Sequence, residues 1–455
     1  MNSNLKMLLL LLAGSLALWG CDAASITSPG ENGDDEDGIF ATIIGGSADD
    51  SGMSVTGTSD GGFLIAGNFN SLNGDFGGLS IGAQDLYAAK LDGNGDVTWI
   101  RAFGGNNIDG ALDVIEDSEG NFVIAGYSAS NTGTFSGLNR GNVDAVLMKV
   151  SPEGVLIWAR TYGGNNNEEA TAVVESPQGG YAITGFTRSF DGNFSFRDNA
   201  SSDIFLISTD VNGQPLWFRS YGGTSDDEGL DLVISSQDRI AVTGSFRSFD
   251  GIFNRVQPGQ TSFYLLEAEL NGDFFALTTY GGSGLDIGHT VITTSDGGYA
   301  IAGASSSDTF HFDSLNRGNF DAFIMKLNTT RSIEWVNTYG GGGADRAFGI
   351  TERTSGGFRI AGETISNNGN FEGLNRGGFD LFILNSDENG NALSATLLGG
   401  SNDETASSLI EFSDGRFALT GSTRSSNGDF SIRSGTDRDI VLITGGPESE
   451  SAPLN

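Results

Sequence analysis

Seven acidic residues recur along the chain at a fixed spacing of 59 residues, each five positions after the first glycine of a Gly-Gly pair. They are Asp50, Asp109, Glu168, Asp227, Asp286, Asp345 and Glu404. If the fold is closed, these carboxylates could circle the mouth of a channel and bind a cation, and Ca²⁺ is the cation that prefers oxygen ligands. Alternatively, each carboxylate caps backbone N–H groups of its own loop. Because a recurring loop needs a recurring local partner, capping is favoured.

A second acidic position repeats with the same spacing and precedes a β-prone run. It is occupied by Asp85, Asp144, Asp203, Asp321, Asp380 and Asp439, with Ser262 in the fourth copy. We expect these residues to form Asx-type turns. Arg140, Arg317 and Arg376 share one slot of the preceding loop and could pair with these acids.

The loops that break the repeat are the candidates for recognition, because binding residues on a regular scaffold concentrate in loops. The fourth copy replaces the usual loop and introduces Arg255. The fifth copy carries Phe310 and His311 where the other copies have glycine followed by a variable residue. Neutral drift in exposed loops would produce the same variation. The candidate partner-binding residues are Arg255, Phe310, His311, Arg140, Arg317 and Arg376.

The composition excludes several classes of function. With 23 Lys and Arg against 58 Asp and Glu, the net charge is -35, and nucleic acid binding needs a basic surface. One cysteine and two histidines exclude internal disulfides and leave almost nothing for His-based catalysis. We therefore expect no enzyme. The alternative is a glycan hydrolase or lyase that uses paired carboxylates at the channel mouth.

The elements that must position these residues repeat with them. Gly-Gly pairs begin at positions 45, 104, 163, 222, 281, 340 and 399, and invariant serines and phenylalanines keep the same phase. In the fifth copy, short β-prone runs cover residues 289–295, 299–303, 320–326 and 332–339, separated by turn residues. Four strands per unit predict the blade of a β-propeller. The tryptophans of the fourth run are expected to pack either between blades or along the outer strands, and they do not suggest a cofactor platform. They are Trp99, Trp158, Trp217 and Trp335.

The two ends of the array predict that it closes into a ring. Residues 39–44 align with a fourth strand that lacks its first three, and the last copy ends after its third strand at residue 444. A ring in which the N-terminal strand completes the final blade requires this offset, and closure removes the free sheet edges. The predicted fold over residues 39–446 is all-β, a seven-bladed propeller with four antiparallel strands per blade.

Three segments of the repeat carry a family resemblance. They are the turn and strand at 296–303, the strand at 321–326, and the strand with its Gly-Gly pair at 335–341. The pattern resembles the short bacterial β-propeller repeats of secreted proteins and lipoproteins (SBBP-type). This resemblance covers roughly residues 39–444 and implies a propeller fold and export from the cytoplasm. It implies little about activity, because propellers host many functions.

The N-terminal segment predicts export. Residues 1–20 have one basic residue followed by an apolar run of about a dozen residues, which indicates a signal peptide. Cys21 follows directly, as in a bacterial lipobox, so we expect acylation at this residue. Residues 21–38 are acidic and predict a flexible tether, and residues 447–455 a disordered tail. The expected protein is a monomeric lipoprotein of the bacterial envelope, periplasmic or surface-exposed, that binds a protein or polysaccharide partner.

Overall fold

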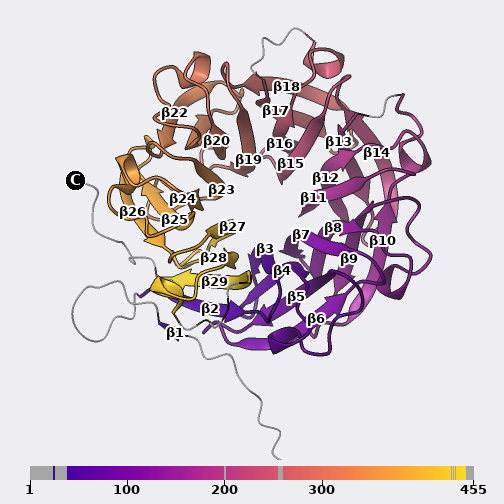
Figure 1. Cartoon of the computed structure of the whole chain (residues 1–455). Helices are drawn as coiled ribbons and strands as arrows, with labels where there is room; N and C mark the ends of the chain where they lie inside the picture. The colour runs from indigo at the N-terminus through magenta and orange to yellow at the C-terminus, as the bar shows by residue number, and fades with distance from the viewer. Residues whose placement is uncertain are drawn as a thin grey trace, which may run out of the picture.

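The computed structural model describes residues 24–25, 38–198, 201–254, 260–431, 433, 435 and 437–446. The signal peptide, Cys21, Arg255 and the C-terminal tail therefore lie outside the described residues. The described chain forms seven antiparallel sheets around a central opening, which confirms the predicted seven-bladed propeller (Figure 1). Among the described residues, no helix is long and apolar enough to cross a membrane.

Each blade contributes four strands in chain order, from the innermost to the outermost. Blade 1 contains β3 (Asp50–Gly57), β4 (Phe63–Phe69), β5 (Asp85–Leu91) and β6 (Val97–Phe103). Blade 2 contains β7 (Asp109–Glu116), β8 (Phe122–Ser128), β9 (Asp144–Val150) and β10 (Leu156–Tyr162). Blade 3 contains β11 (Glu168–Glu175), β12 (Tyr181–Thr187), β13 (Asp203–Thr209) and β14 (Pro215–Tyr221). Blade 4 contains β15 (Asp227–Ile234), β16 (Arg239–Phe246), β17 (Ser262–Glu269) and β18 (Phe274–Tyr280).

Blades 5 and 6 follow the same order, and in blade 7 the N-terminal β2 takes the position of the fourth strand. Blade 5 contains β19 (Asp286–Thr293), β20 (Tyr299–Ser305), β21 (Asp321–Leu327) and β22 (Ile333–Tyr339). Blade 6 contains β23 (Asp345–Glu352), β24 (Phe358–Thr364), β25 (Asp380–Ser386) and β26 (Ala392–Leu398). Blade 7 contains β27 (Glu404–Glu411), β28 (Phe417–Thr423), β29 (Asp439–Gly445) and β2 (Phe40–Ile44). The long loop between second and third strands holds a short 3₁₀ helix: η1 (Gly74–Phe76), η2 (Gly133–Phe135), η3 (Gly192–Phe194), η4 (Gly251–Phe253), η5 (Phe310–Phe312), η6 (Gly369–Phe371) and η7 (Gly428–Phe430).

The ring closes as the sequence predicts. The N-terminal β2 pairs antiparallel with the C-terminal β29, with Phe40 opposite Thr444 and Ile44 opposite Ile440. One feature differs from the expectation of an entirely flexible tether over residues 21–38. Ala24–Ser25 form a two-residue strand, β1, which pairs with β2 and adds a fifth strand to the last sheet. The outer edge of β2 has free backbone groups, and these bind the segment.

The hydrophobic core lies between the blades. One cluster joins Leu64 and Leu86 of blade 1 to Val114 and Phe122 of blade 2, and the other clusters repeat this arrangement around the ring. The third strands are buried along nearly their whole length because neighbouring blades cover both faces. This burial explains their nearly continuous apolar sequences. Each blade therefore depends on its neighbours for its core.

Candidate functional site

The seven recurring acids lie at the start of the first strands, where two loops meet. These are the long loop and the linking loop, which joins the fourth strand of one blade to the first strand of the next. Oδ2 of Asp50 accepts hydrogen bonds from the Gly46 N–H at 3.1 Å and the Ser71 hydroxyl at 2.7 Å. Oδ1 accepts the N–H groups of Asn70 and Ser71. The carboxylate thereby ties both loops together on one face, which we call the loop face.

All seven acids have this environment. Asp50, Asp109, Glu168, Asp227, Asp286, Asp345 and Glu404 are at most 1% exposed. In each blade, the second glycine of the Gly-Gly pair donates its N–H to the acid. The structure thus places these residues as loop caps, and they do not present a ring of exposed oxygen ligands to the channel. Among the described residues, no group of three or more His, Cys, Asp or Glu side chains could hold a metal ion.

The second set of acids also binds the loop that precedes it. Oδ2 of Asp144 accepts the Arg140 N–H at 3.0 Å, and Oδ2 of Asp321 accepts the Arg317 N–H at 2.7 Å. The side chain thus reaches back four residues, whereas an Asx turn reaches forward two. The expectation of an Asx-type turn is therefore corrected, because the acid closes the end of the long loop instead of starting a new turn.

Two of the three candidate arginines act as links between blades. The Arg317 guanidinium donates to the Asn370 side chain in the next blade, and Arg376 forms an ion pair with Asp429. Arg140 remains within its own blade and donates to the Thr161 carbonyl oxygen at 2.8 Å. These contacts engage the guanidinium groups within the chain.

Phe310 is the candidate that remains available to a partner. Its side chain is 71% exposed, although its neighbour Phe312 is fully buried. The backbone φ of Phe310 is +55°, in the left-handed region that favours glycine. The equivalent residue in the other six blades is glycine, at φ between 54° and 65°. Blade 5 thus holds an exposed aromatic residue in a strained backbone conformation.

His311 has a structural role in the same loop. Its Nδ1 lies 3.0 Å from the Gly281 carbonyl oxygen and 3.2 Å from the Gly281 nitrogen. In the next blade, the Asn370 side chain accepts the N–H of Gly340, which is the equivalent glycine. His311 therefore occupies the same capping position as Asn370.

Further exposed aromatics on the loop face were missed from the sequence. Phe190 of blade 3 is 50% exposed and Phe249 of blade 4 is 57% exposed. Both follow the invariant serine of the long loop, where the second and sixth copies have asparagine. Comparison of the position after the invariant serine across the seven copies would have identified these two phenylalanines. Together with Phe310, they place exposed phenylalanines on three consecutive blades.

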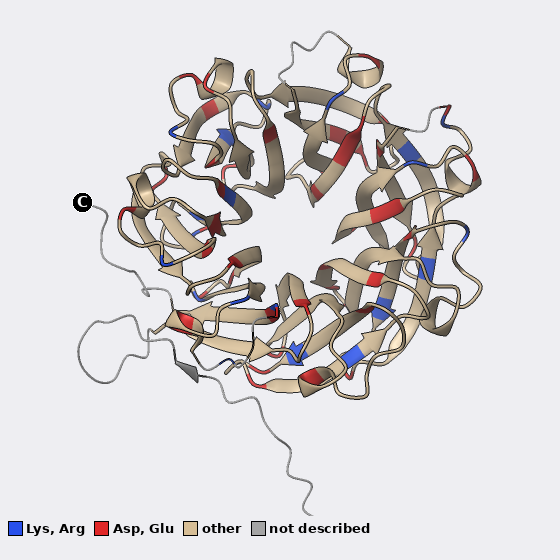
Figure 2. Cartoon of the chain, in the orientation of Figure 1, with Lys and Arg blue, Asp and Glu red and all other residues tan. Residues whose placement is uncertain are grey.

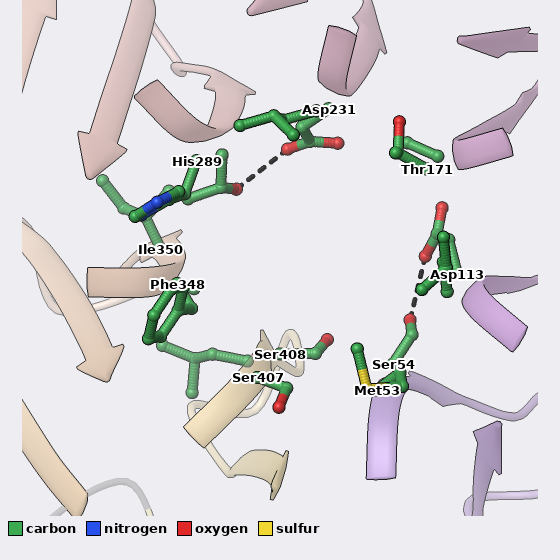
Figure 3. Close-up of a pocket in the computed structure, with 16 residues that line it drawn as sticks. Met53, Ser54, Asp113, Thr171, Asp231, His289, Phe348, Ile350, Ser407 and Ser408 are labelled. Carbon is green, nitrogen blue, oxygen red and sulfur yellow. Dashed lines mark hydrogen bonds between the residues drawn. The ribbon is translucent and has the colours of Figure 1, made fainter. Parts of the chain in front are cut away.

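The central channel is lined by the middle of the first strands (Figure 3). Each first strand has a β-bulge here, and backbone N–H groups leave the sheet to bind side chains of the preceding blade. Asp113 accepts the Ser54 hydroxyl at 2.9 Å and the Val173 N–H at 2.8 Å. Asp231 accepts the Thr290 hydroxyl at 2.9 Å. These side chains link blades around the channel, and the cavity volume of about 160 Å³ is small for an organic ligand.

Burial determines the charge of the channel groups. It raises the pKa of Asp231 to about 7, with a further contribution from the Asp113 carboxylate. Burial also lowers the pKa of His289 to about 4, so the imidazole is neutral at pH 7. The channel therefore carries less charge than its residue types suggest. Figure 2 shows acidic residues both on strands near the central opening and on the outer loops.

A pair of glutamates on adjacent blades was also missed from the sequence. Glu169 and Glu228 are the second residues of the innermost strands β11 and β15. Burial raises the pKa of both, and the charge of Glu228 further raises that of Glu169. Neither side chain has a hydrogen bond or ion pair within the described part of the chain. Periodicity does not identify them, because the other copies have different residues at this position.

Comparison with known proteins gives limited information beyond the fold. No family model matches the chain. The regulatory protein FlaEY of Caulobacter vibrioides is 24% identical over 216 residues, which are 44% of this chain and 23% of that protein. The matched stretch thus spans about a quarter of this curated relative. The resemblance to SBBP-type repeats stays a prediction.

Two solved structures resemble the chain over most of its length. The Neurospora crassa Pan2 WD40 domain has a TM-score of 0.46 and 12% identity, with 92% of this chain and 98% of that one covered. Sqt1 from Chaetomium thermophilum has a TM-score of 0.43 and 10% identity, with 91% and 88% covered. The propeller architecture is established by the strand pairing described above.

Proposed function

We propose that the protein is a non-enzymatic binding scaffold that presents the loop face of its propeller to a protein partner at the bacterial envelope. Phe310 carries this proposal. A non-glycine residue in the left-handed region costs about 1–3 kcal/mol, and such strain concentrates at functional sites. Since the Phe310 ring is mostly exposed, packing does not offset this cost.

The spacing of the aromatics supports a large partner. Phe190, Phe249 and Phe310 lie on loops of three consecutive blades, so one contact with all three has to span several loops. Surfaces of this extent are typical of protein–protein interfaces, which bury about 800 Å² per partner. Exposed aromatic side chains often dominate the energy of such interfaces. A polysaccharide is the other partner expected from the sequence.

Envelope location is proposed from the sequence. The apolar run and Cys21 support acylation and retention at a membrane, although both lie outside the described residues. The test is metabolic labelling with a fatty acid analogue. Label in the natural chain and none in Cys21→Ser is expected, whereas equal labelling would exclude acylation at this residue.

The binding test replaces each exposed phenylalanine by the residue found at the equivalent position of other blades. Phe310→Gly restores the residue of the other six blades, and Phe190→Asn with Phe249→Asn copies blades 2 and 6. Partners would be crosslinked on intact cells, identified, purified and titrated against each variant. We expect Phe310→Gly to weaken binding at least tenfold, because exposed aromatic anchors contribute about 2 kcal/mol or more.

Two controls separate loss of contact from loss of fold. Phe310→Gly should unfold at the same or a higher temperature than the natural chain, because the backbone strain is removed. Phe274→Ala changes an exposed phenylalanine at the start of the outermost strand β18, away from the long loops, and should leave binding unchanged. If the variant that combines Phe310→Gly, Phe190→Asn and Phe249→Asn binds the partner with unchanged affinity, the loop face is not the binding site. If a purified polysaccharide binds the natural chain and these substitutions weaken its binding, the partner is a polysaccharide and not a protein.

The enzymatic alternative rests on Glu169 and Glu228. Two neighbouring carboxylic acids with raised pKa values could supply the acid and base of glycan hydrolysis or elimination. Their pKa values shift in the same direction, whereas an acid and a base need different ones. Turnover of a polysaccharide that is lost in Glu169→Gln and Glu228→Gln would establish this activity in place of simple binding.

A further inference from the structure

Buried carboxylate oxygens without hydrogen-bond partners repeat around the propeller. They are the Oδ1 atoms of Asp85, Asp144, Asp203, Asp321, Asp380 and Asp439, the first residue of the third strand in six blades. Each of these residues is at least nine-tenths buried. A buried ionised oxygen with no donor is costly, because the hydration that it loses is not replaced. The repetition in six blades calls for a common explanation.

These oxygens face a second carboxylate across the boundary between two blades. A Cβ atom placed on Gly340, the first glycine of its pair, would lie 2.4 Å from Oδ1 of Asp321 and 2.4 Å from Oδ2 of Asp345. Only the hydrogen atoms of the glycine fit between the two acids. This close approach explains why the first glycine of the pair is invariant.

The same pairing occurs at other boundaries. At Gly163, a Cβ atom would lie 2.4 Å from Oδ1 of Asp144 and 2.7 Å from Oε2 of Glu168. Asp85–Asp109, Asp380–Glu404 and Asp439–Asp50 are electrostatically coupled across their boundaries as well. We call these five pairs the interblade acid pairs. Asp203 of blade 3 is not among them, because the charges that act on it are those of Arg197, Asp198 and Asp226. The fourth blade has no aspartate at this position, because Ser262 stands opposite Asp286.

Charged neighbours of three of these aspartates act in opposite directions. Besides its paired acid, Asp144 faces the Arg140 guanidinium at 3.6 Å, Asp321 faces Arg317, and Asp380 faces Arg376 and Asp429. Burial is the largest influence, and it raises the pKa of Asp144, Asp321 and Asp380 to about 6 each. The carboxylate of the paired acid raises the pKa further, and the arginine opposes it.

We propose that three of the interblade acid pairs, Asp144–Glu168, Asp321–Asp345 and Asp380–Glu404, are proton-binding sites that strengthen the contacts between blades when the surroundings become mildly acidic. A proton on the unpaired oxygen removes one of two facing negative charges and turns that oxygen into a donor. At alkaline pH both acids of a pair are ionised and repel each other across the boundary between blades.

The direction of the pH dependence follows from linkage. These aspartates have a pKa of about 6 in the folded chain against 3.8 for the unperturbed group, so the folded state binds more protons between these values. Their contribution to stability is therefore fully present below about pH 4 and is lost as the pH rises through 6. This is opposite to the usual behaviour of an ion-paired aspartate.

The test replaces the aspartates by asparagine, which mimics the protonated acid. The variants are Asp144→Asn, Asp321→Asn, Asp380→Asn and the triple variant, with unfolding temperatures measured from pH 5 to 8.5. Asparagine retains an acceptor for the loop N–H and places an amide donor towards the paired acid. We expect the triple variant to unfold several degrees higher at pH 8 and to lose much of the temperature difference between pH 8 and 5.5.

Two controls use other parts of the chain. Ser262→Asp creates a pair in the fourth blade and should lower the unfolding temperature at pH 8 more than at pH 5.5. Asp387→Asn changes a half-buried turn aspartate whose pKa is lowered by hydrogen bonds from Asn391, so it should lower the unfolding temperature at pH 8.

The outcomes distinguish proton binding from metal-ion binding at these pairs. If the triple variant is destabilised equally at both pH values and Ser262→Asp has no pH-dependent effect, the proposal is wrong. If millimolar Ca²⁺ raises the unfolding temperature of the natural chain at pH 8 but not that of the triple variant, the pairs bind a cation and the proposal is likewise overturned.

Discussion

At the scale of the residue, the invariant polar side chains stabilise loops rather than a ligand. The hydroxyl of Ser130 accepts the Asn107 N–H at 2.9 Å and donates to Asp109 at 2.7 Å, and the serine is fully buried. Phe135 is also fully buried and packs the same long loop onto its blade. This arrangement holds the loop face rigid, so exposed residues such as Phe310 start from a fixed position.

Ser130→Ala should destabilise the fold by about 1–3 kcal/mol, because it removes the acceptor of the Asn107 N–H and one of the two donors to Oδ2 of Asp109. Denaturant unfolding of the natural chain and the variant measures this difference. Ser136→Ala is the matched control, since Ser136 is exposed in the same loop and its side chain makes no hydrogen bond within the described chain. An equal effect of both substitutions would show that the hydroxyl of Ser130 does not cap the loop.

At the scale of the element, the outer strands hold each blade against the turn of the next. The Tyr162 hydroxyl donates to the Gly213 carbonyl oxygen at 2.7 Å, and the same contact recurs from Tyr339 to Gly390. Gly213 has φ +71° and lies under the ring of Trp158, which confirms the predicted packing of the tryptophans between blades. In blade 5 the equivalent turn residue is Arg331, since the preceding blade has Ala276 in place of tryptophan.

This correspondence predicts a coupling between turn and ring. A Cβ atom on Gly213 would lie 2.7 Å from the Trp158 ring, so Gly213→Ala should cost about 1–3 kcal/mol from overpacking and positive φ together. In a Trp158→Ala background the same change should cost clearly less, and a double-mutant cycle measures the difference. Additive effects would mean that backbone strain alone selects glycine at this turn.

At the scale of the whole molecule, closure determines whether the blades form one cooperative unit. Ala41 and Ile44 of β2 are buried against the last blade, and each core cluster draws residues from neighbouring blades. A substitution that disrupts packing at one boundary between blades therefore destabilises both of the blades that meet there. A ring of this kind should unfold as a unit instead of blade by blade.

A chain that starts at Gly45 should be at least about 4 kcal/mol less stable than a chain that starts at Gly38, because β2 buries several apolar side chains. Calorimetry of the two chains measures this cost. Comparison of the Gly38 chain with the full chain measures the contribution of residues 1–37, which include β1, and this contribution should be small. Equal unfolding temperatures for the Gly45 and Gly38 chains would contradict closure by β2.

The sequence alone determined the architecture of this protein. The repeat every 59 residues, the four β-prone runs per copy and the offset between residues 39–44 and 440–444 were sufficient for a closed seven-bladed ring. Strands and turns follow from local patterns of apolar, β-branched and turn-forming residues, and the ends of a repeat array are visible in its register.

Only the tertiary structure decided how the side chains are used. Periodicity identified Asp109 and Asp85 as recurring acids and favoured loop capping for the first, but it did not show that the second faces the first from the preceding blade. Nor did it show that Phe310 is strained and exposed while His311 caps the loop. These properties depend on side-chain direction, burial and contacts between chain segments distant in sequence, which arise only when neighbouring blades pack together.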